Sequence, residues 1–361
     1  MLHIVLSGLA RESFQVELVC STFPDCKRHE IIDGIRVNRF SSPLTLWLYA
    51  IIRHFALSSG VDMVVDSIGT GSPLWLSPIF ARSPKLLVIY HIGGRKWYAL
   101  KMLGYIRLHD LPMSILTALA YAAEKLLPFI YRRVPVLTFS RSTANELVGL
   151  GFDRSLVNVV QEGIDLSKYC HSEGKAARPG LVCLGRLSAG KGIEFVLRSM
   201  VSILKELPDT MLYVLGRGEL EPYLKSLSRS LKIDDSVRFL GYVSENEKIN
   251  TLQRCQVLVV PSLKEGFATP VIEANACGTV AVGWDVQGVN EAINDGVNGY
   301  VARYGDINKL SDAIVSLLHN EQVRKNMEER ARLWARKYDK VSMVEKSVRL
   351  ISRLLSSAGQ T

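Results

Sequence analysis

The chain has 361 residues, of which 48% are hydrophobic and 22% are charged. This is the composition of an ordinary soluble globular protein, and the length allows two or three domains that each bury a core. The formal charge of +9 favours anionic partners such as nucleotide phosphates, acidic lipid headgroups or nucleic acid. Nucleic acid is not the expected partner, because the sequence has neither a Lys/Arg run nor a zinc-finger spacing.

The beginning of the chain predicts no signal peptide, because residues 1–4 lack a basic segment and Arg11 and Glu12 follow soon after. One long apolar segment, residues 113–131, raises the question of a membrane span. It carries Glu124 and Lys125, and a charge near the centre of a span costs about 2.5–3.5 kcal/mol. We therefore expect a buried helix there and no spanning segment.

The six cysteines are scattered along the chain without a C-x-x-C pair. Several lie inside apolar runs, which indicates reduced, buried thiols in a reducing compartment. We therefore expect the protein in the cytoplasm, either free or at the inner face of the membrane.

In the first half of the chain, strand-like and helix-like patterns alternate, as in a doubly wound parallel sheet. Only about half a dozen residues separate the first two expected strands, which is too few for a parallel crossover. Either these strands pair in another way or the first crossover helix is absent. The expected strands are residues 3–7, 15–20, 35–40, 61–65, 85–90, 136–140 and 157–160, and the expected helices are residues 44–57, 113–131 and 141–148.

Residues 163–180 are small, charged and Pro-containing, so we place a domain linker there. The alternation then restarts, and residues 306–356 read as almost entirely helical. The sequence therefore predicts an α/β protein with two Rossmann-like domains and a cleft between them. The expected strands of the second half are residues 181–185, 211–216, 237–241, 257–261, 279–283 and 299–302, with helices at residues 193–207, 222–231 and 246–254.

Glu265 and Glu273 flank the start of a short expected helix that follows the strand at residues 257–261. Thr269 is a good N-cap, and Pro270 suits the first helical position. In open α/β sheets, ligands bind at this carboxyl end of the strands. The two carboxylates could accept from sugar or ribose hydroxyls, form a glycosidase-like acid pair, or complement the helix dipole. Their spacing does not decide between these alternatives.

Arg186 and Lys191 lie in residues 184–192, which read as a strand end, a small-residue loop and a helix start. The backbone N–H groups and the dipole at a helix start favour an anion. Two cations there would hold a diphosphate and neutralise charge on a departing nucleotide. The spacing is not that of a P-loop, and the alternative is a solvated basic turn.

His91 ends an expected strand and precedes Gly93 and Gly94, so it reaches a sheet edge either as a site residue or as a structural one. Residues 95–107 then mix cations with Trp and Tyr. This mixture suits an anionic membrane interface, and the alternative is a surface segment that packs on its own domain. The sequence contains no metalloprotease or serine-hydrolase motif.

Taken together, these motifs resemble those of the retaining glycosyltransferases of family 4, among the glycosyl transferases group 1. That family has the GT-B fold of two facing Rossmann-like domains. The resemblance is strongest over residues 136–300. It rests on residues 161–165, 185–192, 288–291 and 298–299, and above all on Glu265 and Glu273, which have seven residues between them.

The resemblance implies a hexosyltransferase that moves a sugar from a nucleoside-diphosphate-sugar donor to a glycan or lipid-linked acceptor hydroxyl. Transfer would proceed with retention of anomeric configuration and without a metal or another cofactor. The donor would bind mainly to the second domain. By matching position, Arg186 and Lys191 would hold the diphosphate. Glu265 would contact sugar hydroxyls beside the backbone of Gly266 and Phe267. Glu273 would bind the ribose, and His91 would lie near the transferred sugar.

The chain departs from the family in a shortened N-terminal region. A glycine-rich loop after the first strand normally approaches the donor phosphates, and here Gly8 stands nearly alone. We assign Gly8 to substrate binding by its position. The expected domains are residues 1–170 and 171–337, with a helix in residues 338–361 packing back on the first domain. Two other functions remain open: a non-catalytic nucleotide-sugar-binding protein with a degenerate first domain, and a sugar-nucleotide epimerase.

Overall fold

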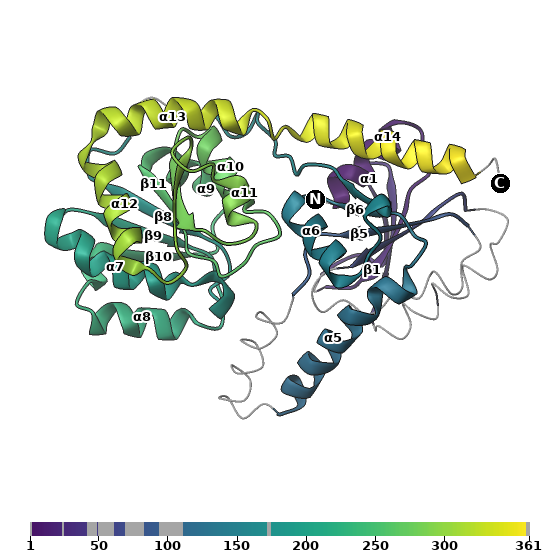
Figure 1. Cartoon of the computed structure of the whole chain (residues 1–361), viewed down its shortest axis with the longest axis horizontal. Helices are drawn as coiled ribbons and strands as arrows, with labels where there is room; N and C mark the ends of the chain where they lie inside the picture. The colour runs from purple at the N-terminus through teal and green to yellow at the C-terminus, as the bar shows by residue number, and fades with distance from the viewer. Residues whose placement is uncertain are drawn as a thin grey trace. The chain divides into compact units, whose positions relative to one another are not determined.

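The computed structural model describes residues 2–23, 25–41, 49, 61–68, 83–93, 111–171 and 175–358. The chain divides into two compact units (Figure 1). The first draws on Met1–Gly93, Leu116–Gly163 and Lys340–Thr361, and the second on Gly94–Ile115 and Ile164–Asp339. The expected helix at residues 44–57 and the aromatic, basic segment at residues 95–107 lie outside the described residues.

The second unit is built on a six-stranded parallel sheet in the order β10-β9-β8-β11-β12-β13. All six strands expected from the apolar runs are confirmed, with ends that differ by a residue or so. Their bounds are β8 Gly180–Leu184, β9 Met211–Leu215, β10 Val237–Gly241, β11 Val257–Val260, β12 Val280–Trp284 and β13 Gly299–Ala302.

Helices cover both faces of this sheet, which explains why its strands read as continuous apolar runs. Leu181 of β8 points into one core with α7, α8 and α12, and the next residue, Val182, points into the other with α9, α10 and α11. Figure 1 shows the sheet between these two groups of helices. Their bounds are α7 Ile193–Glu206, α8 Glu221–Ser230, α9 Glu245–Arg254, α10 Thr269–Ala276, α11 Val289–Ala292, α12 Ile307–His319 and α13 Glu321–Ala335.

The first unit contains a four-stranded parallel sheet in the order β4-β5-β6-β7 and a three-stranded sheet in the order β1-β3-β2. β1 pairs with β3 in parallel, and β2 pairs with β3 antiparallel. β2 was not expected from the sequence. The bounds are β1 Glu17–Ser21, β2 His29–Ile32, β3 Ile35–Phe40, β4 Val64–Ile68, β5 Lys85–Ile89, β6 Val136–Thr138 and β7 Val157–Val159, with helices α1 Leu2–Arg11, α5 Leu111–Ile130, α6 Arg141–Leu150 and α14 Lys340–Ala358.

The expected strand at residues 3–7 is wrong, because these residues belong to the helix α1. The apolar residues Leu2, Val5, Leu6 and Leu9 recur with helical spacing, and they pack in the core that also contains α14. A short apolar run does not distinguish a strand from a buried helix. In Figure 1, α14 in yellow lies beside α1 in purple, in agreement with their mutual contacts.

Gly8 therefore lies inside the helix α1, and not in the loop after a first strand that the family normally has at this point. A Cβ atom at Gly8 would come within 2.2 Å of Val344 Cγ1 on α14. The missing side chain lets the two helices approach closely. The position of Gly8 is explained by packing between α1 and α14.

The long apolar segment forms the helix α5 as expected, but it is only partly buried, because Ile115, Leu119, Leu126 and Phe129 are exposed. Leu127 of α5, and Tyr131 just after its end, pack with α6 and one face of the β4–β7 sheet. Of the helices that the structure describes, none is both long and apolar enough to cross a membrane.

Candidate functional site

The two candidate loops of the second unit meet at the point where the strand order reverses. From β8 the chain moves outward to β9 and β10, and from β11 it moves outward in the opposite direction to β12 and β13. β8 and β11 are neighbours, so the loops that follow them lie on the two sides of the switch point. Ligands of open α/β sheets bind at this place, beyond the carboxyl ends of the strands.

The loop after β11 is fixed by backbone hydrogen bonds to both of its neighbours. Leu263 N donates to Gly190 O in the loop after β8 at 2.9 Å. On the other side, Glu265 N donates to Gln287 O at 3.1 Å, and Ala268 N donates to Gly288 O at 2.9 Å. These bonds set the position of the Glu265 backbone within the second unit.

Lys191 and Glu265 come together across the switch point. Lys191 Nζ lies 2.6 Å from Glu265 Oε1, and both side chains are largely shielded from solvent, at 28% and 17% exposure. Lys191 ends the 3-10 turn Ala189–Lys191, and Gly192 connects this turn to α7. A charge-assisted bond of this kind holds both groups in one geometry.

The other residues expected at this edge differ in exposure. Arg186 is exposed and forms no side-chain ion pair with any residue in the described part of the chain, so its guanidinium is available to an anion. Phe267 is buried, with its ring 5.3 Å from that of Tyr338. Phe267 therefore presents its backbone and not its ring at this edge, beside the half-buried Gly266.

The helix α10 begins one residue earlier than expected. Ala268 is the N-cap residue, Thr269 is the first helical residue, and Pro270 follows within the first turn. The N-cap residue is an alanine, so its own side chain makes no capping hydrogen bond. The dipole at the start of α10 adds positive potential near Glu265.

Glu273 lies one turn inside α10 and joins a network that the sequence did not predict. Its Oε1 accepts from Tyr169 Oη at 2.8 Å and from Lys248 Nζ at 3.0 Å. Lys248 Nζ also lies 3.1 Å from Glu245 Oε2, and Tyr169 donates to Glu245 as well. Glu273, which was predicted to bind the ribose, is thus already held by two hydrogen-bond donors of the protein.

Burial and the two carboxylates shift the pKa values in this network. Burial raises the pKa of Tyr169, and the charge of Glu273 raises it further. Burial lowers the pKa of Lys248, but the charge of Glu273 and the bonds to both acids outweigh it, so the net pKa is raised. Burial raises the pKa of Glu245, and the bonds from Tyr169 and Lys248 reverse that effect. At neutral pH the lysine and Glu245 are therefore charged, and the tyrosine is protonated.

One sequence signal could have located this network. Ser244 and Glu247 form a capping box that starts α9 just after β10. That start places Glu245 and Lys248 at the carboxyl edge of the sheet, the edge at which α10 also begins. Tyr169 carries no such signal, because it lies in the irregular segment before β8.

His91 belongs to the first unit, where it follows β5 and is half-buried. Two residues later, Gly93 N donates to Glu124 Oε2 of α5 at 2.8 Å, in a buried position. The carboxylate of Glu124 therefore fixes the backbone just after His91. Seven residues after Glu124, Tyr131 Oη donates to the buried Asp66 Oδ2 of β4 at 2.7 Å.

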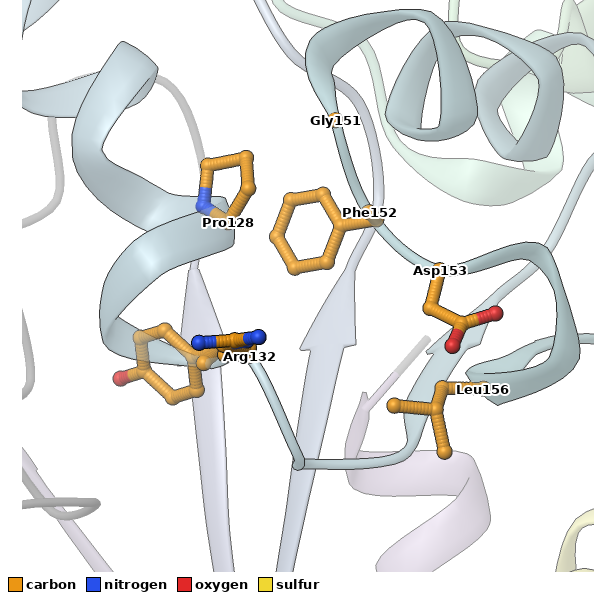
Figure 2. Close-up of a pocket in the computed structure, with 7 residues that line it drawn as sticks. Pro128, Arg132, Gly151, Phe152, Asp153 and Leu156 are labelled. Carbon is orange, nitrogen blue, oxygen red and sulfur yellow. The ribbon is translucent and has the colours of Figure 1, made fainter.

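A pocket of about 200 Å³ in the first unit contains none of the expected site residues. Figure 2 shows its lining, in which Arg132 and Asp153 are the charged side chains. No group of three or more His, Cys, Asp or Glu side chains within the described ranges is arranged to hold a metal ion.

Residues 172–334 match the family model described as Glycosyl transferases group 1. Among curated proteins, the chain is 30% identical over 232 residues to an N,N'-diacetylbacillosaminyl-diphospho-undecaprenol alpha-1,3-N-acetylgalactosaminyltransferase of Campylobacter jejuni. That match covers 60% of this chain and 60% of the relative. The chain therefore spans less than two thirds of the relative's length.

The whole chain has the fold of two solved structures. Sucrose-phosphate synthase from Thermosynechococcus elongatus matches with a TM-score of 0.78 and 17% identity, over 99% of this chain and 93% of that one. Anabaena HepE in complex with UDP-glucose matches with a TM-score of 0.75 and 19% identity, over 97% and 94%. Residues 172–334 thus match the glycosyl transferases group 1 model, and the chain has the GT-B fold.

Proposed function

We propose that the protein is a glycosyltransferase that moves a sugar from a nucleoside diphosphate to an acceptor hydroxyl, with retention of anomeric configuration and without a metal. The contact between Lys191 and Glu265 at the switch point of the second sheet carries this proposal. It places a cation suited to a phosphate next to a carboxylate suited to sugar hydroxyls. The similarity to the Campylobacter jejuni transferase supports the same reaction class.

The proposed division of labour follows from charge. Arg186 and Lys191 bind the diphosphate and stabilise the negative charge that grows on it as the sugar–phosphate bond breaks. Glu265 accepts from sugar hydroxyls, and Glu273 accepts from the ribose. His91 is assigned to the transferred sugar by family resemblance, and its substitution by Ala tests that assignment.

In the proposed reaction the acceptor oxygen bonds to the anomeric carbon on the face from which the diphosphate leaves. The carbon–oxygen bond to the diphosphate breaks, and the proton of the acceptor hydroxyl passes to the departing phosphate oxygen. No covalent enzyme intermediate is required. The activation barrier is lowered because charged groups are already in position to stabilise the negative charge that develops on the leaving group.

The test is release of UDP or GDP from a panel of nucleotide sugars in the presence of candidate acceptors. Lys191→Ala is expected to reduce release by two orders of magnitude or more, about the effect of removing one donor that stabilises transition-state charge. Lys309→Ala is the control, because Lys309 lies exposed on α12. Retained activity with EDTA and an unchanged anomeric configuration in the product are also expected.

Other outcomes favour the alternatives. A melting temperature that rises with a nucleotide sugar, without nucleotide release for any acceptor, indicates a non-catalytic binding protein. A change in donor stereochemistry without an acceptor indicates an epimerase. If no nucleotide or nucleotide sugar shifts the melting temperature, the proposal is wrong.

We also propose that the protein binds an anionic membrane surface through α5. Ile115, Leu119, Leu126 and Phe129 recur at spacings of four, seven and three residues, so they share one face of the helix, and all four are exposed. The exposed cations nearby are Lys125, Arg132 and Arg133, whereas the one acid of α5, Glu124, is buried. An apolar stripe with neighbouring cations suits an anionic interface.

Flotation with phosphatidylcholine vesicles, with and without phosphatidylglycerol, tests this attachment. Phe129 is 78% exposed, so Phe129→Ser should leave the fold intact and reduce binding about tenfold, the loss expected from one large apolar side chain. Leu333→Ser is the control, because Leu333 is 58% exposed on α13 in the second unit. Flotation that needs no anionic lipid, or equal effects of the two variants, would contradict the proposal.

A further inference from the structure

The contacts of Glu273 are unequal at its two oxygens. Tyr169 and Lys248 both donate to Oε1, at 2.8 Å and 3.0 Å. Within the described residues, no donor contacts Oε2. The side chain is 14% exposed, so it is shielded without being sealed from solvent. Oε1 therefore accepts hydrogen bonds from the protein, and Oε2 can still accept one from a ligand.

Lys248 and Tyr169, the two donors to Glu273, are held in place by further contacts. Lys248 Nζ lies 3.1 Å from Glu245 Oε2 on the same helix, and its ammonium lies 5.2 Å from the centre of the Tyr169 ring. Tyr169 is buried in the core with α9 and α10. Because Lys248 and Tyr169 come from different segments and are both anchored, they restrict the rotation of the Glu273 carboxylate.

The charges in the network favour a second donor at Oε2. Two carboxylates face one ammonium, and the single proton of the Tyr169 hydroxyl can be donated to only one carboxylate at a time. The network therefore carries an excess of acceptors. A neutral diol satisfies such an acceptor without adding charge, which suits the hydroxyls of a ribose better than a second cation or a phosphate.

We propose that Tyr169 and Lys248 are positioning residues for ribose recognition, which hold Glu273 by Oε1 so that Oε2 accepts from the diol of the nucleotide. This inference rests on the proposed function and names groups that act through Glu273. Their contribution is pre-organisation of the carboxylate, because an acceptor that is already ordered loses less entropy when the ligand binds.

The experiment measures the affinities of UDP and GDP against their 2′,3′-dideoxy counterparts, which lack the diol. The wild-type protein should prefer the ribose form of the nucleotide it binds by about tenfold or more, as expected for a hydrogen bond to a charged group. In Tyr169→Phe and Lys248→Met this ratio should fall, with little change in the affinity for the dideoxy form. Lys248→Arg keeps the cation and should retain more of the ratio than Lys248→Met.

Lys225→Met is the matched control, because Lys225 pairs with Glu221 at 2.7 Å on α8, outside this network. A purely structural role would lower the melting temperature without changing the ribose preference. The inference is overturned if the ratio in Tyr169→Phe and Lys248→Met equals that of Lys225→Met, or if the wild-type protein shows no ribose preference. If the wild-type protein binds neither UDP nor GDP, the proposed function itself fails.

Discussion

Lys191 Nζ and Glu265 Oε1 lie 2.6 Å apart, although the two residues are 74 positions apart in the chain. One residue ends the turn after β8, and the other lies in the loop after β11, on the neighbouring strand. A lysine nitrogen has three protons to donate, so Lys191 can keep Glu265 and still bind a phosphate oxygen. In the proposed function the two residues act together, with Glu265 on the sugar and Lys191 on the diphosphate.

The first prediction is that Lys191 and Glu265 are coupled. Lys191→Ala and Glu265→Ala should each reduce nucleotide release by two orders of magnitude or more, and the double variant should lose much less than the product of the two effects. A double-mutant cycle on the rate of nucleotide release measures this coupling. Lys225 and Glu221 form the control pair, since exposed pairs of this kind contribute about 0–1 kcal/mol. Independent, multiplicative effects at Lys191 and Glu265 would show that the contact has no role in the reaction.

The second prediction concerns Gly192, which lies between the turn of Lys191 and α7. Its φ is +62°, and a Cβ atom there would come within 2.2 Å of Pro261 O in the loop after β11. Gly192→Ala should therefore destabilise the protein by more than the roughly 1–2 kcal/mol of a left-handed residue alone, and should weaken UDP or GDP binding.

Gly296→Ala separates the cost of the left-handed backbone from that of the steric clash. Gly296 has a φ of +71°, and a Cβ atom added there would meet nothing within 4 Å. It should show the conformational cost only, and it should leave nucleotide affinity unchanged. Urea unfolding and nucleotide titration of both variants provide the comparison. Equal losses of stability in the two variants would mean that the close approach of the loops is unimportant.

The third prediction contrasts two helical glycines of the first unit. A Cβ atom at Gly8 would come within 2.2 Å of Val344 Cγ1, whereas one at Gly149 of α6 would meet nothing within 4 Å. Gly8→Ala should destabilise the protein by about 1–3 kcal/mol through overpacking. Gly149→Ala should stabilise it by about 0.5–1 kcal/mol, since alanine favours the helix. Thermal unfolding measures both, and Val344→Ala should recover part of the stability of Gly8→Ala.

The fourth prediction concerns the pH dependence of stability. Burial lowers the pKa of Lys175 from 10.5 to about 8, against the opposing charge of Glu328, and Lys175 Nζ donates to Thr279 Oγ1 at 2.6 Å. Between about pH 8 and 10.5 the unfolded chain binds more protons at this residue than the folded one, so the free energy of unfolding rises with pH in that window. Below pH 8 the buried lysine is charged in both states, and its desolvation remains a cost.

Lys175→Met removes this rise. The wild-type protein should therefore gain stability relative to Lys175→Met as the pH increases from 8 to 10, measured as the difference in melting temperature. Lys309→Met provides the baseline, because Lys309 is 71% exposed. A difference that stays constant with pH would mean that Lys175 keeps an ordinary pKa in the folded protein.

The sequence identified much of the second unit because its signals are local. Each strand is a short apolar run between two helices, and burial on both faces makes such runs continuous. Capping boxes, prolines and glycines mark the helix starts and ends within a few residues. The candidate residues Arg186, Lys191, Glu265 and Glu273 could be named for the same reason, since each follows a recognisable strand.

The structure of the first unit was harder to predict from the sequence, and α1 shows why. The run from Leu2 to Leu9 is apolar enough for a strand, and its helical spacing matters only when α14 is available to cover it. The residue that permits the contact, Val344, lies near the other end of the chain. No local signal connects Gly8 with Val344.

By itself, the sequence determined the α/β class, the strands of the second unit and the residue types at the carboxyl edge of its sheet. Only the tertiary structure decided that Lys191 contacts Glu265 and that Tyr169 and Lys248 hold Glu273 by one oxygen. The reason is physical: apolar periodicity reflects which side of an element is buried, whereas a polar contact depends on which elements are neighbours. That neighbourhood is set by the strand order β10-β9-β8-β11-β12-β13, which brings residues 74 positions apart to the same edge.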